Sequence, residues 1–294
     1  MLHGLGMLLD PEGKPLQAAE NVPPLTERQN EEAEQRTSVS AIVVHEAIRK
    51  DGDEELQRSA SALAWSGLAA GLLMGFSFLA EGLLRSRLPN APWRPLIVNL
   101  GYPLGFLMVI IGRQQLFTEN TLTAIIPLLA RRNWSTFFSV LRLWAIVLVT
   151  NLCGAHIFAW VTADTHLLKP EVQAALLEIG RDAVSVSFGD AILRGIFAGW
   201  LIASVVWMNA ATDSGRFTII VTLTYVVGLA ELTHIVAGAV EVLYLVMRGE
   251  RSWISVMTGY IVPTFLGNVA GGVSLVSALN HAQVVAGMQK APAK

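Results

Sequence analysis

Residues 100–121 read LGYPLGFLMVIIGRQQLFTENT, and this stretch is the strongest indication of the fold in the sequence. It starts as an apolar run and breaks at Arg113-Gln114-Gln115, and a second apolar run, 122–129, follows its polar end. A helix needs about 20 residues to cross a bilayer, and neither half is that long. Hydrocarbon tolerates the exposed backbone of a broken helix only where the break is buried in protein or lines a wet cavity. Because half-helices that meet at mid-membrane build the substrate sites of many transporters, the stretch indicates the lining of a pore.

The composition of the whole chain also indicates a membrane protein. Of its 294 residues, 53% are hydrophobic and 15% are charged, whereas soluble domains carry about 25% charged residues. A net charge of −2 leaves no basic footprint for nucleic acid, so no nucleic-acid partner is expected. The chain has no nucleotide-binding motif and no metal-ligand spacing, so neither a cofactor nor a metal is expected.

Cysteine chemistry receives little support. Cys153 is the single cysteine, which excludes an intramolecular disulfide. Cys153 and His156 share a helix face, as a nucleophile and its base would, but no third group or oxyanion device accompanies them. We therefore expect that the chain is not an enzyme.

Six apolar runs separate along the chain, and polar linkers lie between them. The runs are 60–82, 96–130, 137–162, 188–211, 217–247 and 254–279. An even number of spans places both termini on one side of the membrane. Lys and Arg are divided almost evenly between the two sides, with a slight excess on the side of the termini, which weakly favours cytoplasmic termini.

The spans show a weak internal pattern. With three spans in each half, the second of each half is the interrupted one, at 113–120 and at 231–234. Matching interruptions point to an inverted 3+3 repeat with its site between the halves, since an odd number of spans reverses direction. Glycines at four-residue spacing in the first span and a similar set in the sixth predict close helix packing.

The first 59 residues differ in kind from the rest. Residues 1–35 look loosely ordered, and 37–50 place Val39, Ile42, Val43 and Ala47 on one face of an amphipathic helix. This helix either lies at the membrane interface or packs beneath the mouth of the pore and controls access. The sequence thus predicts an N-terminal cytoplasmic segment (1–59), a transmembrane pore domain (60–280) and a cytoplasmic C-terminal tail (281–294).

Three residues carry the candidate chemistry. His234 is an ionisable residue inside an apolar span, where its alternatives are a substrate contact and a structural bond between helices. Thr118 offers a hydroxyl that either contacts substrate or serves as a turn residue. Arg113 either pairs with an acidic side chain (Glu119, Glu231 or Glu241) or stands near the pore as a positive charge.

Four ordered motifs resemble those of the formate/nitrite transporter family. They are GRQQLFT at 112–118, the fourth-span segment 193–208 with its LRGI and two tryptophans, HIVA at 234–237 and PTFLGNVAGG at 263–272. The resemblance implies an all-α, aquaporin-like membrane protein with six transmembrane helices per protomer and broken second and fifth helices. It further implies a homo-pentamer in a bacterial-type inner membrane, with a pore in each protomer and cytoplasmic termini.

The resemblance also implies which residues line the pore. Leu116, Phe106 and Tyr102 match apolar constrictions around the central histidine, and Val227 stands where the other constriction usually has a phenylalanine. The remaining pore positions that it implies are Phe117, Thr233, Gly199 and Asn268.

Some of these positions depart from the family pattern. Ala183 replaces a lysine, Gly199 an asparagine that faces the pore, and Thr233 the glutamate before the histidine. These departures are typical of a divergent branch of the family. We also expect Gly199 to leave space for a larger solute.

The sequence therefore predicts a membrane channel or transporter for a small solute. The favoured solute is a monovalent weak-acid anion of the formate/nitrite type, which passes a central histidine and a threonine of the re-entrant loop between apolar constrictions. The alternative is a family scaffold with altered or lost anion transport, serving a different or neutral solute or a regulatory role.

Overall fold

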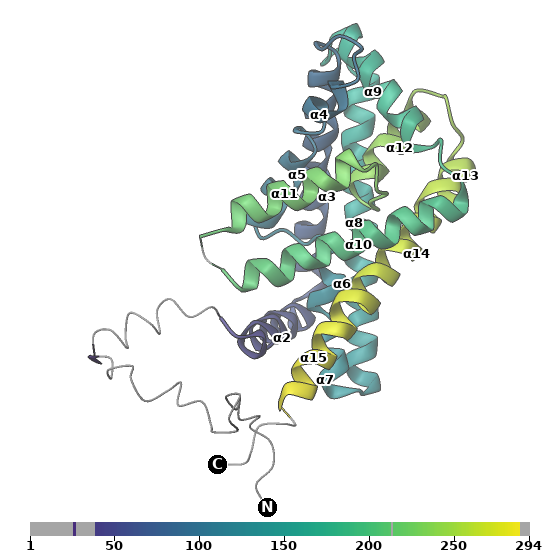
Figure 1. The fold of residues 1–294 in the computed structure, drawn as a ribbon. Helices are drawn as coiled ribbons and strands as arrows, with labels where there is room; N and C mark the ends of the chain where they lie inside the picture. Colours follow the sequence, from purple (N-terminus) through teal and green to yellow (C-terminus); the bar gives the residue numbers. More distant parts are fainter. Residues whose placement is uncertain (1–25, 28–38, 213, 289–294) are drawn as a thin grey trace, which may run out of the picture. The chain divides into compact units, whose positions relative to one another are not determined.

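A computed structural model describes residues 26–27, 39–212 and 214–288 (Figure 1). The chain divides into two units, 1–38 and 39–294, and only the second is described in any detail. The segment 1–35, for which the sequence predicts loose order, therefore lies almost wholly outside the described residues. The same is true of residues 289–294 at the end of the C-terminal tail.

Every regular element in the described part of residues 39–288 is a helix. The helices of the first half are α2 (Ala41–Gln57), α3 (Ala60–Arg85), α4 (Arg94–Val98), α5 (Pro103–Ile111), α6 (Asn120–Thr123), α7 (Ile125–Arg131) and α8 (Trp134–Asp164). Those of the second half are α9 (Pro170–Ala183), α10 (Phe188–Ala210), α11 (Arg216–Leu229), α12 (Ala237–Met247), α13 (Trp253–Val256), η1 (Met257–Ile261), α14 (Val262–Ala270), η2 (Gly271–Ala278) and α15 (Leu279–Met288).

Five stretches of the described residues are long and apolar enough to cross a membrane. They are Ala60–Arg85, Arg94–Ile111, Trp134–Asp164, Phe188–Ala210 and Trp253–Gly287. Two shorter apolar helices, α11 and α12, follow one another across the second predicted interruption. The expected spans thus occur as helices, and the expected breaks separate α5 from α6 and α11 from α12.

Glycines allow the spanning helices to approach closely. A Cβ on Gly71 of α3 would overlap the carbonyl of Asn151 in α8, and a Cβ on Gly271 would overlap the carbonyl of Ile196 in α10. Helices in lipid gain no hydrophobic drive from one another, so close backbone contact supplies their attraction. The packing predicted from the glycine spacing is therefore present between α3 and α8 and between α10 and the α14–η2 segment.

Helix α2 presents a different face from the one that the sequence predicts. Val39, Ile42 and Val43 are 46–56% exposed, whereas Val44 and Ile48 are only 1–2% exposed. The buried pair packs against Leu122 and Ile126 of the α6–α7 segment and Ala203 of α10. The amphipathic helix exists, but its docking face is rotated from the expected one.

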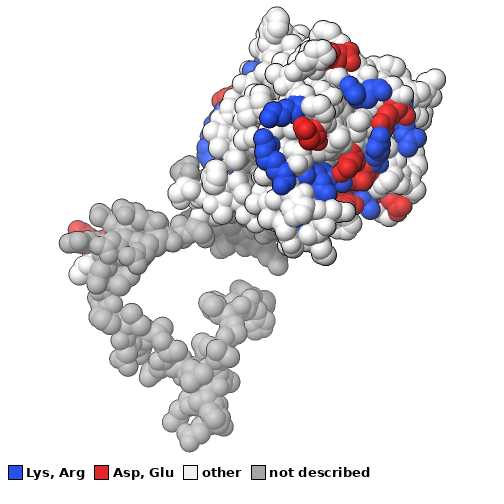
Figure 2. Space-filling view, turned by 90° about the horizontal axis from the view of Figure 1, so that it is seen from above, with Lys and Arg blue, Asp and Glu red and all other residues white. Residues whose placement is uncertain are grey.

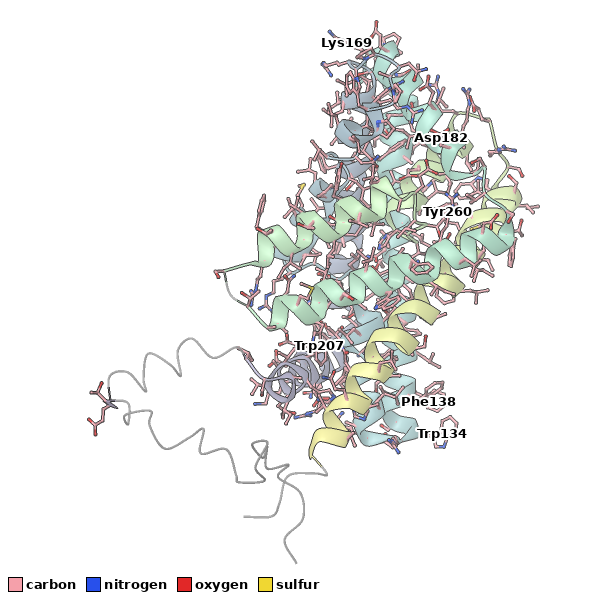
Figure 3. The ribbon with its side chains drawn as sticks, in the orientation of Figure 1. Trp134, Phe138, Lys169, Asp182, Trp207 and Tyr260 are labelled. Atoms are coloured by element: carbon pink, nitrogen blue, oxygen red, sulfur yellow. The ribbon has the colours of Figure 1, made fainter. Side chains whose placement is uncertain are left out.

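Large aromatic side chains mark one end of α8. Trp134 and Phe138 are 74% and 63% exposed and point away from the ribbon, while Lys169 follows the other end of the helix (Figure 3). Tryptophan is enriched at membrane–water interfaces, so its place here is that of an interfacial anchor. A helix of 31 residues is about 46 Å long, which exceeds the hydrocarbon thickness and reaches both interfaces.

Candidate functional site

The two breaks follow the same backbone path. The half-helix before each break runs into a residue with a left-handed backbone, Arg113 at φ 52° and Glu231 at φ 50°. The next amide bonds the carbonyl five residues back, at 2.9 Å for Gln114 and 3.0 Å for Leu232. Equivalent positions keep the same spacing along both segments, which supports an internal repeat of the two halves.

A buried asparagine of α8 holds the first break. The Oδ1 atom of Asn151 accepts a hydrogen bond from the Phe117 amide at 2.9 Å. Its Nδ2 atom donates to the carbonyls of Gly67 and Gln115, each at 2.8 Å. One side chain thus satisfies an amide and a carbonyl that the broken helix leaves open, as a membrane interior requires, and its third bond ties the break to α3.

A buried asparagine of α14 holds the second break in the same way. Asn268 accepts from the Ile235 amide at 2.8 Å and donates to the carbonyls of Gly195 and Thr233, both at 2.9 Å. Asn268 was expected among the pore residues, but all three of its hydrogen bonds go to backbone atoms. Its role in the structure is to hold the loop that carries His234.

The residues between the clamped positions are Leu116 in the first break and His234 in the second. The Nε2 atom of His234 lies 2.8 Å from the Thr118 hydroxyl, so a side chain from each break meets at the centre. The Nδ1 atom accepts hydrogen bonds from the amides of Val236 at 3.3 Å and Ala237 at 3.1 Å, where α12 begins. Because both amides donate to Nδ1, the ring is neutral and carries its proton on Nε2, which donates to Thr118.

Aromatic rings line one side of this centre. The Phe106 ring lies edge-on to the His234 ring at 5.0 Å, and the Tyr102 ring lies 5.3 Å from that of Phe106. His234 and Phe106 are at most 1% exposed, and Thr118 is fully buried. The two residues proposed to contact solute are thus enclosed by apolar and aromatic walls.

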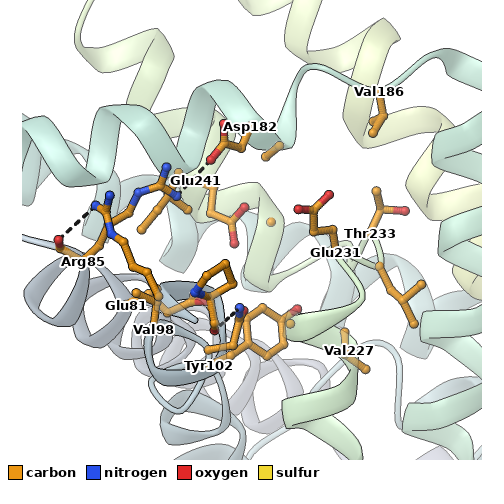
Figure 4. A pocket seen from close by; sticks show the side chains of 18 of the residues that line it. Glu81, Arg85, Val98, Tyr102, Asp182, Val186, Val227, Glu231, Thr233 and Glu241 are labelled. Atoms are coloured by element: carbon orange, nitrogen blue, oxygen red, sulfur yellow. Dashed lines mark hydrogen bonds and ion pairs between the residues drawn. The ribbon is translucent and has the colours of Figure 1, made fainter. Parts of the chain in front are cut away.

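A pocket opens on each side of the centre, and neither pocket is lined by His234 or Thr118. The α9-side pocket has a volume of about 310 Å³, and Tyr102, Val227 and Thr233 are among its lining residues (Figure 4). The α2-side pocket has a volume of about 260 Å³, and Leu116 and Arg113 line it. Of the predicted constriction residues, Tyr102 and Val227 thus line the α9-side pocket and Leu116 lines the α2-side pocket, whereas Phe106 lines neither and packs against His234.

Charged residues around the pockets are arranged differently from the expectation. Glu231 pairs with Arg194 at 3.3 Å, so it is not a partner of Arg113, which lies in the other pocket. Arg113 interacts electrostatically with Glu119, although no ion pair joins them in the described residues. Of the partners that the sequence allowed, Glu119 alone shares a pocket with Arg113.

The face over α4 and α9 carries charges of both signs. Figure 2 shows basic and acidic side chains interspersed on the face seen from above. Arg85 bonds Glu178 at 3.0 Å and Asp182 at 2.9 Å, and Arg181 forms a bidentate pair with Glu250. The hydrogen bonds from Arg181 lower the pKa of the Glu250 carboxyl. These pairs leave no large field of a single sign at this mouth.

Three further predicted positions make contacts that hold helices together, and one of them, Thr233, also lines the α9-side pocket. A Cβ on Gly199 would overlap the backbone of Asn268, so the space that we expected beside Gly199 is filled by α14. The Phe117 ring packs against Trp144 and Phe265, each at 5.6 Å, and lines neither pocket. The Thr233 hydroxyl donates to the Ala191 carbonyl at 2.7 Å. Ala183, which matches the lysine of the family pattern, does line the α9-side pocket.

Several residues of the site escaped the sequence analysis. Glu81 lines the α9-side pocket, and Asn151 clamps the first break. Thr224 of α11 lies one helical turn from Ile220, which lines the α2-side pocket, and one turn from Val227, which lines the α9-side pocket. Helical spacing in the sequence would therefore have placed Thr224 between these two residues. The signal for Glu81 and Asn151 was a polar residue within an apolar span.

Apolar spanning helices, two matched backbone breaks and a buried histidine between opposed pockets define the class: this chain is a multi-pass membrane protein built as a channel or transporter. The formate/nitrite transporter family model matches residues 42–282. The chain therefore belongs to the formate/nitrite transporter family, whose members are channels and transporters rather than enzymes.

Known relatives differ in their distance from this chain. It is 40% identical over 251 residues to the inner membrane protein YfdC of Escherichia coli, covering 85% of this chain and 81% of that protein. It is 24% identical to the formate channel BtFdhC of Bacillus thuringiensis, over 79% of this chain and 91% of that channel.

Solved structures share the fold at low sequence identity. A pentameric formate channel with formate bound matches with a TM-score of 0.65 at 18% identity, over 81% of this chain and 99% of the other. An ion channel of the same family matches with a TM-score of 0.70 at 16% identity, over 82% and 98% of the two chains. These matches establish the all-helical channel fold.

Proposed function

We propose that this protein conducts a small monovalent weak-acid anion of the formate/nitrite type, with Thr118 and His234 as its central contacts. The observation that carries the proposal is the 2.8 Å bond between the Thr118 hydroxyl and the His234 Nε2 atom. It joins the two breaks at a buried point between opposed pockets. Half-helix breaks at mid-membrane are where transporters place their substrate sites.

The chemistry of the centre suits a small hydrogen-bonding solute. The Nε2–H of the neutral His234 ring is a donor, and the Thr118 hydroxyl both accepts from it and keeps its own proton for a third group. A carboxylate or nitrite oxygen in contact with Thr118 would receive that proton's hydrogen bond. The neighbouring Phe106 and Leu116 side chains restrict the passage to solutes of a few atoms.

Flux into liposomes tests this proposal. Formate and nitrite uptake should exceed that of protein-free liposomes, and Thr118→Val should lower formate uptake by about tenfold, the scale of one lost hydrogen bond to a charged partner. The matched control is Thr162→Val, because the buried Thr162 hydroxyl donates only to its own helix. Equal uptake by the Thr118→Val variant and wild type would remove Thr118 from the pathway.

Altered selectivity is the second candidate function, and Ala183 favours it. The α9-side pocket has an alanine where the family pattern has a cation, so it attracts anions less strongly. Formate and nitrite flux at background, together with uptake of an uncharged solute such as urea, would support this second candidate over the first.

Ala183→Lys tests the same point directly. We expect the variant to raise formate uptake roughly 10-fold at low salt and less at high salt, because a cation in the pocket raises the local anion concentration. Gln173→Lys on the same helix is the control, since Gln173 does not line the pocket. A matching change at Gly199 is excluded by its contact with the Asn268 backbone.

We also propose a homo-pentamer in a bacterial-type inner membrane, with both termini in the cytoplasm. The fold match to a pentameric formate channel and the 40% identity to an inner membrane protein support this assembly and location. Native mass measurement in detergent should give five times the 31.8 kDa of one chain. A stable monomer under the same conditions would count against the pentamer.

A further inference from the structure

Two acidic side chains from separate helices share the α9-side pocket. Glu81 of α3 is 5% exposed, and its Oε2 atom is buried without a hydrogen-bond partner. Glu241 of α12 lines the same pocket (Figure 4), and the described residues offer neither carboxyl an ion pair. The two carboxyls interact electrostatically with each other.

The surrounding charged groups do not neutralise this pair. Arg85, on the same helix as Glu81, interacts electrostatically with Glu81 but makes its hydrogen bonds to Glu178 and Asp182. Asp182 in turn adds a negative charge that acts on Glu241. Arg94 of α4 lies 3.7 Å from Glu178. Across the pocket, Arg194 of α10 is paired with Glu231 at 3.3 Å.

The remaining titratable groups that face the pair are phenols. Tyr102 precedes α5 and Tyr260 lies in η1, and both line the pocket. Phenols are neutral at physiological pH and supply no cation. The two carboxyls therefore face each other's charge without a dedicated counter-ion.

Two carboxylates, one buried and one partly buried, that act on each other cannot both ionise without a large electrostatic cost, so such a pair retains a proton. The central histidine is not an alternative proton carrier. Its Nδ1 atom is occupied by the amides of Val236 and Ala237, so a second proton on the ring would displace both hydrogen bonds. A proton that is available to a solute is thus held in the pocket and not at the centre.

We propose that Glu81 and Glu241 form a proton-holding pair that protonates a weak-acid anion in the α9-side pocket before it reaches the aromatic walls. This inference rests on the proposed function. In the step, the O–H bond of the protonated carboxyl breaks and an O–H bond forms on the anion, which continues as the neutral acid. The carboxylate left behind takes its next proton from hydronium in the solvent that enters the pocket. The reverse step serves transport in the other direction.

The pair explains how an anion passes Phe106 and Tyr102, which bring no positive charge to the constriction. An ion in an apolar constriction loses its hydration, which is a large cost, whereas the neutral acid loses little. Protonation in the pocket removes this cost just before the constriction. It also accounts for the two carboxyls in the pocket of a protein that belongs to a family of anion transporters.

Formate uptake by full-length protein in liposomes, measured between about pH 5 and about pH 8, tests the proposal with Glu81→Gln, Glu241→Gln and the double variant. Because an amide cannot hand over a proton, the double variant should lose roughly a hundredfold in formate uptake at the alkaline end. It should approach wild type at the acid end, where bulk water supplies formic acid. The control is Glu171→Gln, an exposed carboxyl of α9 outside the pocket, which should match wild type throughout.

The sign of the effect separates this proposal from simple repulsion. If the carboxylates only repel anions, their removal should raise formate uptake at every pH. Uptake by the double variant that equals or exceeds wild type at the alkaline end would overturn the proton-holding pair.

An infrared measurement provides a readout that does not depend on transport. At neutral pH, wild-type protein should show the C=O band of a protonated carboxyl, and the band should weaken in the double variant and keep its intensity in Glu171→Gln. A band of undiminished intensity in the double variant would overturn the pair. Absence of the band in wild type would overturn the pair. If wild type shows the band but conducts no formate at any pH, the proposed solute class is wrong and the proton-holding pair stands.

Discussion

Asn151 and Asn268 each bond one amide and one carbonyl that a break leaves open, and each adds a third bond to a carbonyl of a neighbouring helix. Neither side chain is exposed to solvent, so water cannot replace these bonds when the amide is removed. A leucine keeps the branched outline of the side chain, with a larger volume, but has neither donor nor acceptor. The substitution therefore removes all three hydrogen bonds while the position stays filled.

We expect Asn151→Leu and Asn268→Leu each to lower the free energy of unfolding by about 3 kcal/mol or more, because each leaves one amide and one carbonyl of a break buried and unpaired. Denaturation of the purified protein in detergent measures the loss. Asn133→Ala is the graded control, since this cap of α8 makes one bond, to the Thr136 amide at 2.8 Å, and should cost about 1 kcal/mol. A loss at Asn151 no larger than that at Asn133 would contradict the clamp.

Residue types in the sequence predicted part of this site, but the contacts of the remaining residues depend on how the helices pack. His234 and Thr118 were found because an ionisable residue and a re-entrant hydroxyl are unusual in an apolar span. Gly199 was assigned to the pore because a sequence motif locates a residue along a helix but does not show which neighbouring element that residue faces. The Cβ direction at Gly199 depends on where α14 lies, and that contact is set by the fold.

At the scale of elements, α2 shows how periodicity can predict a helix and miss its face. Four residues in a row, 41–44, are apolar, so more than one face of the helix satisfies the pattern. The choice is made by the partners, since Leu122, Ile126 and Ala203 receive Val44 and Ile48. Gly52 adds to this contact, because a Cβ there would overlap the carbonyl of Thr123.

The same truncation on opposite faces of α2 tests the docking. Ile48→Ala should weaken it by about 2–4 kcal/mol, because a buried side chain is lost. Ile42→Ala should change it by less than about 0.5 kcal/mol, since Ile42 is 46% exposed. Amide hydrogen exchange in α2 reports both values. Since Ile48 also lines the α2-side pocket, faster formate flux in the Ile48 variant alone would link this docking to access.

Acid should also loosen α2. The Nε2 atom of His45 lies 2.9 Å from the Nδ1 atom of His281, and burial, followed by the charge of His281, lowers the pKa of His45 below 6.5. A lowered pKa means that the docked state favours the neutral ring. This contribution is therefore complete above about pH 6.5 and is lost as the pH falls through the lower docked-state pKa.

Hydrogen exchange in α2, corrected for its intrinsic pH dependence, should accordingly rise below about pH 6. In a His45→Gln variant, which has no ring to protonate, the rise should be much smaller. An identical acid response in wild type and variant would assign the effect to other groups.

The spans of the whole molecule were more predictable than its contacts. Runs of apolar residues fix where helices cross a bilayer because lipid leaves the backbone no other partner. The pairing of Arg194 with Glu231 was not predictable, since a sequence shows many acids for each arginine. The 40% identity to YfdC and the family match then place the chain among known proteins without naming its solute.

Orientation across the membrane can be measured at the two ends of α8. In a Cys153→Ala background, Thr165→Cys should react with an impermeant maleimide added outside intact cells, while Ser135→Cys should react only after permeabilisation. Both positions are exposed; Ser135 lies in the first turn of α8 and Thr165 directly follows its last residue. They therefore differ chiefly in the side of the membrane on which they lie. The reverse pattern would place the termini outside.

The two asparagine clamps also have a consequence for how the gene could be divided. All groups held by Asn151 come before residue 164, and all groups held by Asn268 come after residue 170, so each half closes its own break. Two polypeptides cut within the linker 165–169 and made together in one cell should then reassemble into a working channel, joined by the Thr118–His234 bond and the helix contacts around it. With two such polypeptides, each half of the protein could be mutated independently of the other half.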